Sequence, residues 1–175
     1  MIDAGYEDAV IVENPALLKL KRALVNEQIA PEILNYENAA VSELRERVEQ
    51  QEAAVNDVMD GDASDGDVFT TGLMQMELDR VRFLIRSYLR VRLAKIEKHA
   101  FHIMSSAVTS ALLSAAERKF AEGFIELTAT HLDGVLATMP ERFRELGAAD
   151  MVVEPALSAY VFCRAREDIE DFRLR

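Results

Sequence analysis

Apolar residues recur at helical spacing along most of the chain. The longest uninterrupted run is residues 74–102, which contain neither proline nor glycine. An unbroken helix of that length spans roughly 40 Å. On a helical wheel of ~100° per residue, its apolar side chains fill an arc of roughly 200°, about twice what a surface helix needs. The pattern therefore predicts a long central helix that other segments cover on more than one side.

Three shorter helices are expected around it, over residues 14–30, 38–59 and 114–139. The second of these carries apolar positions that step by three and four, as in a coiled-coil seam with one polar member. These positions are Val41, Leu44, Val48, Gln51, Val55 and Val58. The seam is too short for a free coiled coil, so we expect it to pack against the central helix. Residues 103–111 show no clear period and should form the turn into the last helix.

Residues 156–166 have a different pattern, with Tyr, Val and Phe close together, which favours a strand. The expected fold class is thus an all-α helical bundle of four to five helices with a long central helix, followed by a short β segment. We expect a flexible acidic N-terminal tail (1–13), an α-helical domain (14–147), a linker (148–155) and the start of a small β-rich domain (156–175).

The composition argues against several classes of protein, including nucleic-acid-binding, membrane-spanning and secreted proteins. The net charge of −11 over 175 residues argues against nucleic acid as the main partner of the whole surface. The single cysteine, Cys163, cannot form an internal disulfide, which favours a reducing compartment. The apolar runs are too short for a membrane span of ~20 residues. The acidic N-terminus lacks the basic region of a secretory signal.

The central helix is basic, although the chain is acidic. Residues 79–98 carry seven bases and two acids. Arg82, Arg86 and Arg90 form one stripe opposite the apolar arc, and a single-strand nucleic-acid-binding module built on them is a rival hypothesis. A second rival hypothesis is that the chain forms a self-contained helical homodimer with a regulatory role.

Two bases, Arg92 and Lys95, fall inside the apolar arc, where an unpaired charge is costly. They must either extend their charged ends to solvent or meet carboxylates from another helix or another chain. The acids of the 38–59 helix are candidates for this pairing: Glu43, Glu46, Glu49 and Glu52.

We expect no catalytic residues, no cofactor and no metal site. The acidic stretch 60–67 has alternating oxygen ligands, but an EF-hand loop needs Gly at its sixth position and Glu at its twelfth, where this chain has Asp65 and Thr71. A linker is therefore favoured. His131 lies on the apolar face of the last helix, and a histidine at the edge of the core, donating to a carbonyl, is favoured over a metal ligand.

The central stretch also carries a family resemblance. Residues 76–83 read MELDRVRF and residues 86–98 read RSYLRVRLAKIEK. Both resemble the signature helix of the GINS complex subunit of the Sld-five type, the fourth GINS subunit of eukaryotic DNA replication. Residues 26–34 and 155–167 resemble two further segments of that family. The family's second domain continues well beyond the point where residue 175 falls.

The resemblance implies a non-catalytic scaffold in the nucleus. The implied partners are the other three GINS subunits and, through the complex, the MCM helicase hexamer and Cdc-forty-five. A replication-fork hub protein is a further candidate partner of the N-terminal tail. Contact with DNA would be weak or indirect, and no membrane is implied. As a hypothesis, the subunit interface includes Tyr88, Arg92, Lys95, Ile96, Tyr160 and Phe162.

Overall fold

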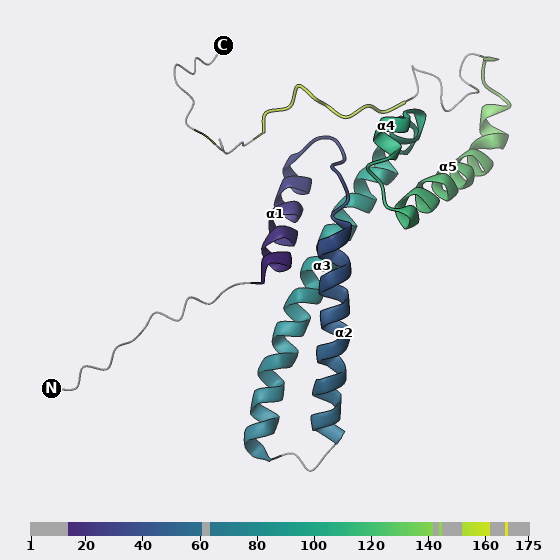
Figure 1. Cartoon of the computed structure of the whole chain (residues 1–175). Coiled ribbons are helices and arrows are strands. Elements are labelled where there is room, and N and C mark those ends of the chain that lie inside the picture. Colours follow the sequence, from purple (N-terminus) through teal and green to yellow (C-terminus); the bar gives the residue numbers. More distant parts are fainter. Residues whose placement is uncertain (1–13, 61–63, 142–143, 145–151, 162–166, 168–175) are drawn as a thin grey trace. The chain divides into compact units, whose positions relative to one another are not determined.

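The computed structural model describes residues 14–60, 64–141, 144, 152–161 and 167, and most of these residues lie in helices (Figure 1). The described residues contain five helices. They are α1 (Pro15–Ile29), α2 (Asn38–Asp60), α3 (Asp65–Ser105), α4 (Ala107–Ser110) and α5 (Ala115–Leu136). The prediction of an all-α bundle with a long central helix is confirmed.

The central helix is longer than the sequence pattern indicated. α3 has 41 residues and begins nine residues before the predicted start at Met74. Its first turn is stabilised by Ser64, whose Oγ accepts a hydrogen bond from the Asp67 N–H at 3.3 Å, while Asp67 accepts one from the Ser64 N–H at 3.1 Å. This reciprocal capping turns the end of the acidic stretch into a helix start. The prediction of a loop through residue 67 was wrong at this end.

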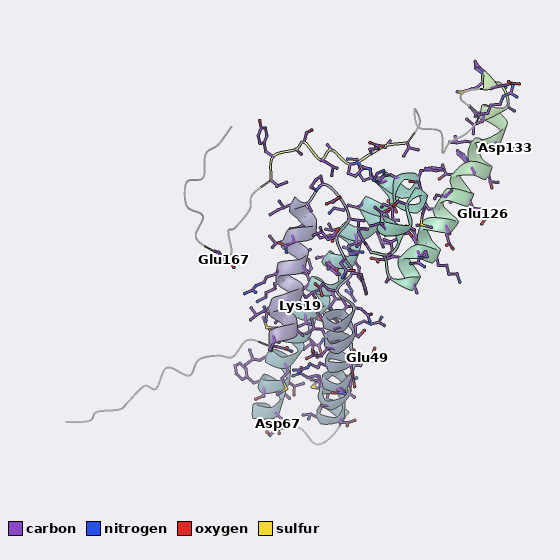
Figure 2. All side chains as sticks on the ribbon, turned by 45° about the horizontal axis from the view of Figure 1, so that its top comes forward. Lys19, Glu49, Asp67, Glu126, Asp133 and Glu167 are labelled. Atoms are coloured by element: carbon purple, nitrogen blue, oxygen red, sulfur yellow. The ribbon has the colours of Figure 1, made fainter. Side chains whose placement is uncertain are left out.

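The first part of α1, all of α2 and the first part of α3 pack into one unit, which comprises Met1–Val25 and Asn35–Ala94. α2 and α3 run side by side as a helical hairpin (Figure 1), and Asp67 lies near its tip (Figure 2). One core cluster joins all three helices through Ala16, Leu17, Leu20, Leu24, Val41, Leu44, Ile85 and Tyr88. A second cluster, nearer the tip, joins Val48 and Val55 to Leu78. The expected packing of the α2 seam on the central helix is therefore confirmed for four of its positions, whereas Gln51 and Val58 are exposed.

The second unit comprises Asn26–Leu34 and Lys95–Arg175. Its core is a cluster of Ile33, Ile96, Ile103, Leu113 and Ala121. α3 kinks at His99, where φ is −122° and ψ is 24°, outside the helical region. α5 begins with a complete capping box between Ser114 and Glu117.

The predicted strand over residues 156–166 is not confirmed. Residues 152–161 form turns and irregular backbone, and 162–166 lie outside the described residues. The β-rich start at 156–175, like the acidic tail at 1–13, therefore stays a prediction.

Candidate subunit interface

Arg92 is fully buried, and for a guanidinium this requires contacts that offset the loss of hydration. Its central carbon lies 5.3 Å from the ring centroid of Tyr36 and 5.7 Å from that of Tyr88. The two rings stack with their centroids 6.1 Å apart. Desolvated cation–π contacts of this kind are worth about 2 kcal/mol. Arg92 thus holds the segment before α2 against α3.

Tyr88 is also fully buried and has a polar contact of its own. The backbone N–H of Glu37 donates to its hydroxyl oxygen at 3.1 Å. The Glu37 carboxylate in turn lies 2.7 Å from the Lys19 ammonium on α1. Tyr88 therefore ties the α1–α2 connection to α3 inside the first unit.

Lys95 meets a carboxylate, but not one from α2. Its Nζ lies 2.9 Å from Oε1 of Glu27, a residue of α1 that is only 1 % exposed. The same Nζ donates to the carbonyl oxygen of Glu32 at 2.8 Å. The expectation that the α2 acids would pair with Arg92 or Lys95 finds no support: the lysine partner is Glu27, and the α2 residue Glu52 pairs with Arg82 instead. The chain bends at Pro31 and Glu32, after Glu27, and helical periodicity does not reveal which residues such a bend brings close to α3.

The other predicted interface residues differ in how far they are exposed. Ile96 is fully buried in the core of the second unit. Tyr160 is fully exposed, and Phe162 lies outside the described residues. Of the six predicted residues, Tyr88, Arg92 and Ile96 are thus covered by this chain's own side chains. Their assignment to a subunit interface stays a prediction.

The largest exposed apolar side chains of α3 lie on another face, which the sequence analysis missed. Phe69 and Met76 are each 70 % exposed, Phe83 is 65 % exposed and Leu73 is 53 % exposed. They step by four, three and seven residues, with Arg80 at the intervening position of the heptad pattern. We call these five residues the α3 outer seam. It lies on the opposite side of α3 from Leu78 and Ile85, and its three-and-four spacing was the signal that could have found it.

Arg80 is the one charged residue of the outer seam, and its partner Glu77 lies beside the seam. Arg80 donates from Nε to Oε2 of Glu77 at 2.8 Å. Arg80 also donates from Nη2 to Oε1 of Glu77. The two hydrogen bonds hold the pKa of the Glu77 carboxyl below its usual value. The seam is therefore an apolar stripe with a single ion pair at its edge, which is the composition that helix–helix packing uses.

α5 presents a second exposed apolar face. Along α5 the buried residues are Glu117 and Ala121, both near its start. Further along the helix Leu127 is 68 % exposed and Val135 is 52 % exposed. The sticks in Figure 2 show the Glu126 and Asp133 side chains on this same helix. A helix with apolar side chains this open to water needs a covering surface.

The basic stripe is partly neutralised within the chain. Arg82 forms an ion pair with Glu52 of α2 and lies 3.5 Å from Asp79. The hydrogen bond to Glu52 raises the pKa of the Arg82 guanidinium. An arginine held by two carboxylates is poorly placed to contact phosphates, and this weakens the contribution of Arg82 to the nucleic-acid hypothesis for the stripe of Arg82, Arg86 and Arg90.

The prediction that His131 is a histidine at the edge of the core is wrong. His131 is exposed on α5, so it is not at the edge of the core. His99 has that role: it is 7 % exposed, and its Nδ1 lies 2.8 Å from the carbonyl oxygen of Val153, to which it must donate.

Among the described residues, no group of three or more His, Cys, Asp or Glu side chains is arranged to hold a metal ion. In the same part of the chain, no helix is long and apolar enough to cross a membrane.

Comparisons with known proteins agree on one family. The family model for the Sld5 GINS complex protein helical bundle domain matches residues 41–135. The chain is 39 % identical over 171 residues to the DNA replication complex GINS protein SLD5 of Arabidopsis thaliana, covering 93 % of this chain and 76 % of that protein. It is 32 % identical over 175 residues to the human protein of the same name, covering 97 % of this chain and 76 % of the human one. The relative from Schizosaccharomyces pombe is 32 % identical over 152 residues, or 84 % of this chain and 70 % of the relative.

Proposed function

Because the chain belongs to the Sld5 family of GINS complex proteins, a subunit family of DNA replication, we propose that it is a non-catalytic scaffold that binds the other three GINS subunits through helix packing. The α3 outer seam is the observation that carries this proposal. It offers four large apolar side chains at coiled-coil spacing that are at least half exposed, on a helix already anchored by its other face.

The energetic argument is one of uncovered apolar surface. Burying a fully exposed side chain of this size contributes about 1.5–3 kcal/mol. More than half of the surface of each apolar seam residue is still open to water, so covering the outer seam would offset part of the entropy cost of association. The exposed face of α5 adds a second surface of the same kind. A chain with two such faces has the properties expected of an assembly member.

The finer role follows from the family. We propose that the complex joins the MCM helicase hexamer and Cdc45 in the replicative helicase, in the nucleus, and supports both initiation and elongation. The N-terminal tail, residues 1–13, is proposed as a site for a fork hub protein. What supports these partners is the resemblance of residues 76–98 to the signature helix of the family. The relatives are themselves DNA replication complex GINS proteins, which supports the role in replication.

The six predicted interface residues remain part of the proposal, in two different roles. Tyr88, Arg92, Lys95 and Ile96 would act from inside, since their contacts set the shape of the helices that carry the exposed faces. Tyr160 is exposed and would contact a partner directly. Phe162, which lies outside the described residues, is proposed to act with it.

The test is co-expression with the other three GINS subunits, followed by size-exclusion chromatography with light scattering. In Met76→Glu/Phe83→Glu, two of the five seam side chains are replaced by carboxylates that must be desolvated in any apolar contact. We expect the variant chain to elute apart from the other subunits, whereas the wild-type chain co-elutes with them. Both positions are exposed, so the isolated variant should keep its helical circular-dichroism spectrum.

The matched control is Val108→Glu on α4, an apolar side chain that is 77 % exposed and lies outside the seam. It should assemble as the wild type does. Full assembly of the seam variant would contradict the proposal. A stable dimer of this chain alone that excludes the other subunits would favour the homodimer hypothesis instead.

A further inference from the structure

A groove lies along the α2–α3 hairpin, within the first unit. It has a volume of about 280 Å³, and its floor is formed by Val48, Ile85 and Leu89. Val48 and Ile85 belong to the two neighbouring core clusters of the hairpin.

The rim of the groove is charged, with an excess of positive charge. Its charged residues are Arg45, Glu49, Glu52, Arg82 and Arg86. Arg82 is paired with Glu52. Arg45 and Arg86 are exposed, and neither forms a hydrogen bond or ion pair with another described residue. Two available guanidinium groups beside one remaining carboxylate make a local basic site on a chain of net charge −11.

The complementary sequence is the chain's own N-terminal tail. Residues 1–13 read MIDAGYEDAVIVE, with four acidic side chains, no lysine or arginine, and apolar residues between the acids. An acidic and apolar peptide is the ligand that a basic rim over an apolar floor recognises.

The N-terminal tail joins α1 close to the groove. Asn14 caps α1 by accepting a hydrogen bond from the Ala16 N–H at 2.9 Å. Ala16 and Leu17 of that first turn belong to the same core cluster as Ile85 of the groove floor. A chain of 13 residues reaches about 43 Å when extended, whereas packed helices lie only ~8–10 Å apart. The tail can therefore cross α1 and α3 and still have length to spare.

We propose that the N-terminal tail docks in the α2–α3 groove of its own chain, with its carboxylates against Arg45 and Arg86 and its apolar side chains on the floor of Val48, Ile85 and Leu89. Docking within the chain carries a small loop-closure cost, because the tail is short and tethered beside the site. A docked tail is also withheld from other partners, so the groove regulates when the tail can be bound from outside.

The experiment is photo-crosslinking of the full chain carrying Tyr6→p-benzoylphenylalanine, prepared as an equal mixture of ¹⁴N- and ¹⁵N-labelled chains. Mass spectrometry then separates crosslinks within one chain from those between chains. We expect crosslinks within one chain to residues 45–52 and 82–89. Crosslinks mainly between chains, crosslinks scattered over the surface, or a crosslink yield at background would each overturn the proposal.

Reversing the charge of the two groove arginines is the second part of the experiment. Arg45→Glu/Arg86→Glu should reduce the crosslink yield at the groove about tenfold, because two favourable charge contacts become repulsive. Lys98→Glu/Lys119→Glu changes the net charge equally at two exposed positions in the second unit and should leave the yield within about twofold. Melting curves of both variants report whether the fold is intact. Equal losses in the two variants would mean that net charge, and not the groove, governs the crosslink.

Discussion

Lys95 of α3 and Glu27 of α1 lie 68 residues apart in sequence, yet their charged atoms are 2.9 Å apart, with the carboxylate 1 % exposed and the lysine side chain 14 % exposed. The Leu34 N–H donates to the same carboxylate oxygen at 3.4 Å. The pair therefore fixes the path of the connection between α1 and α2, and it satisfies a lysine that the sequence places on an apolar face.

Removing one member of the Lys95–Glu27 pair should lower the free energy of unfolding. Lys95→Met leaves the Glu27 carboxylate buried without its ammonium, and we expect a loss of about 3 kcal/mol in the free energy of unfolding. Glu27→Gln/Lys95→Met removes both charges and should recover part of that loss. Urea titrations followed by circular dichroism measure both variants. Additive losses in the double variant would show that the two residues do not interact.

Arg92 should not tolerate replacement by lysine. Lysine keeps the charge but loses the planar group that lies over the rings of Tyr36 and Tyr88. We expect Arg92→Lys to lower the free energy of unfolding by about 2 kcal/mol. As a control, Arg86→Lys changes an exposed arginine of the same helix and should have little effect. Equal effects at the two positions would rule out the stacking account.

The capping of α3 predicts a pH dependence at Asp67. Hydrogen bonds from Ser64 lower the pKa of the Asp67 carboxyl. Since the folded pKa lies below the unfolded one, the capping interaction stabilises the helix above the ordinary aspartate pKa and is lost as pH falls through the lowered value. Carbon-detected NMR titration of the Asp67 carboxyl should give a pKa below that of a model peptide, and Ser64→Ala should move it back up. An unchanged pKa in Ser64→Ala would contradict the capping geometry.

Two helical glycines offer a stability gain. A β-carbon added at Gly72 of α3 or Gly134 of α5 would meet no atom within 4 Å. Alanine loses less backbone entropy than glycine on helix formation, so each of Gly72→Ala and Gly134→Ala should raise the free energy of unfolding by roughly 0.5–1 kcal/mol. Thermal melts of the isolated chain test this. A lower melting temperature for either variant would contradict this expectation.

Helical periodicity predicted the existence and approximate bounds of α1, α2 and α5, because apolar spacing at three and four residues is a local property of the sequence. The N-terminal extension of α3 was missed because Gly66, Gly72 and the surrounding acids are read locally as a loop, whereas the Ser64 cap and packing at Leu78 favour helix. Local patterns also cannot say which of two apolar faces a neighbour covers.

The predicted interface shows this limit most clearly. The sequence placed Tyr88, Arg92 and Ile96 on the most apolar side of the central helix, and that side is the one the chain buries itself. Phe83 and Met76 were overlooked because they lie outside the main arc. The pairing of Lys95 with Glu27 depends on a turn between α1 and α2, and no spacing rule could have identified it.

Hydroxyl-radical footprinting of Met76, with and without the other three GINS subunits, tests the central claim most directly. Met76 is 70 % exposed in this chain and its thioether is readily oxidised. If the α3 outer seam packs on a sister subunit, Met76 oxidation should fall at least about fivefold in the assembled complex, while oxidation of the exposed Met59 of α2 serves as the internal comparison. Equal oxidation of Met76 in the isolated chain and in the assembled complex would contradict the account.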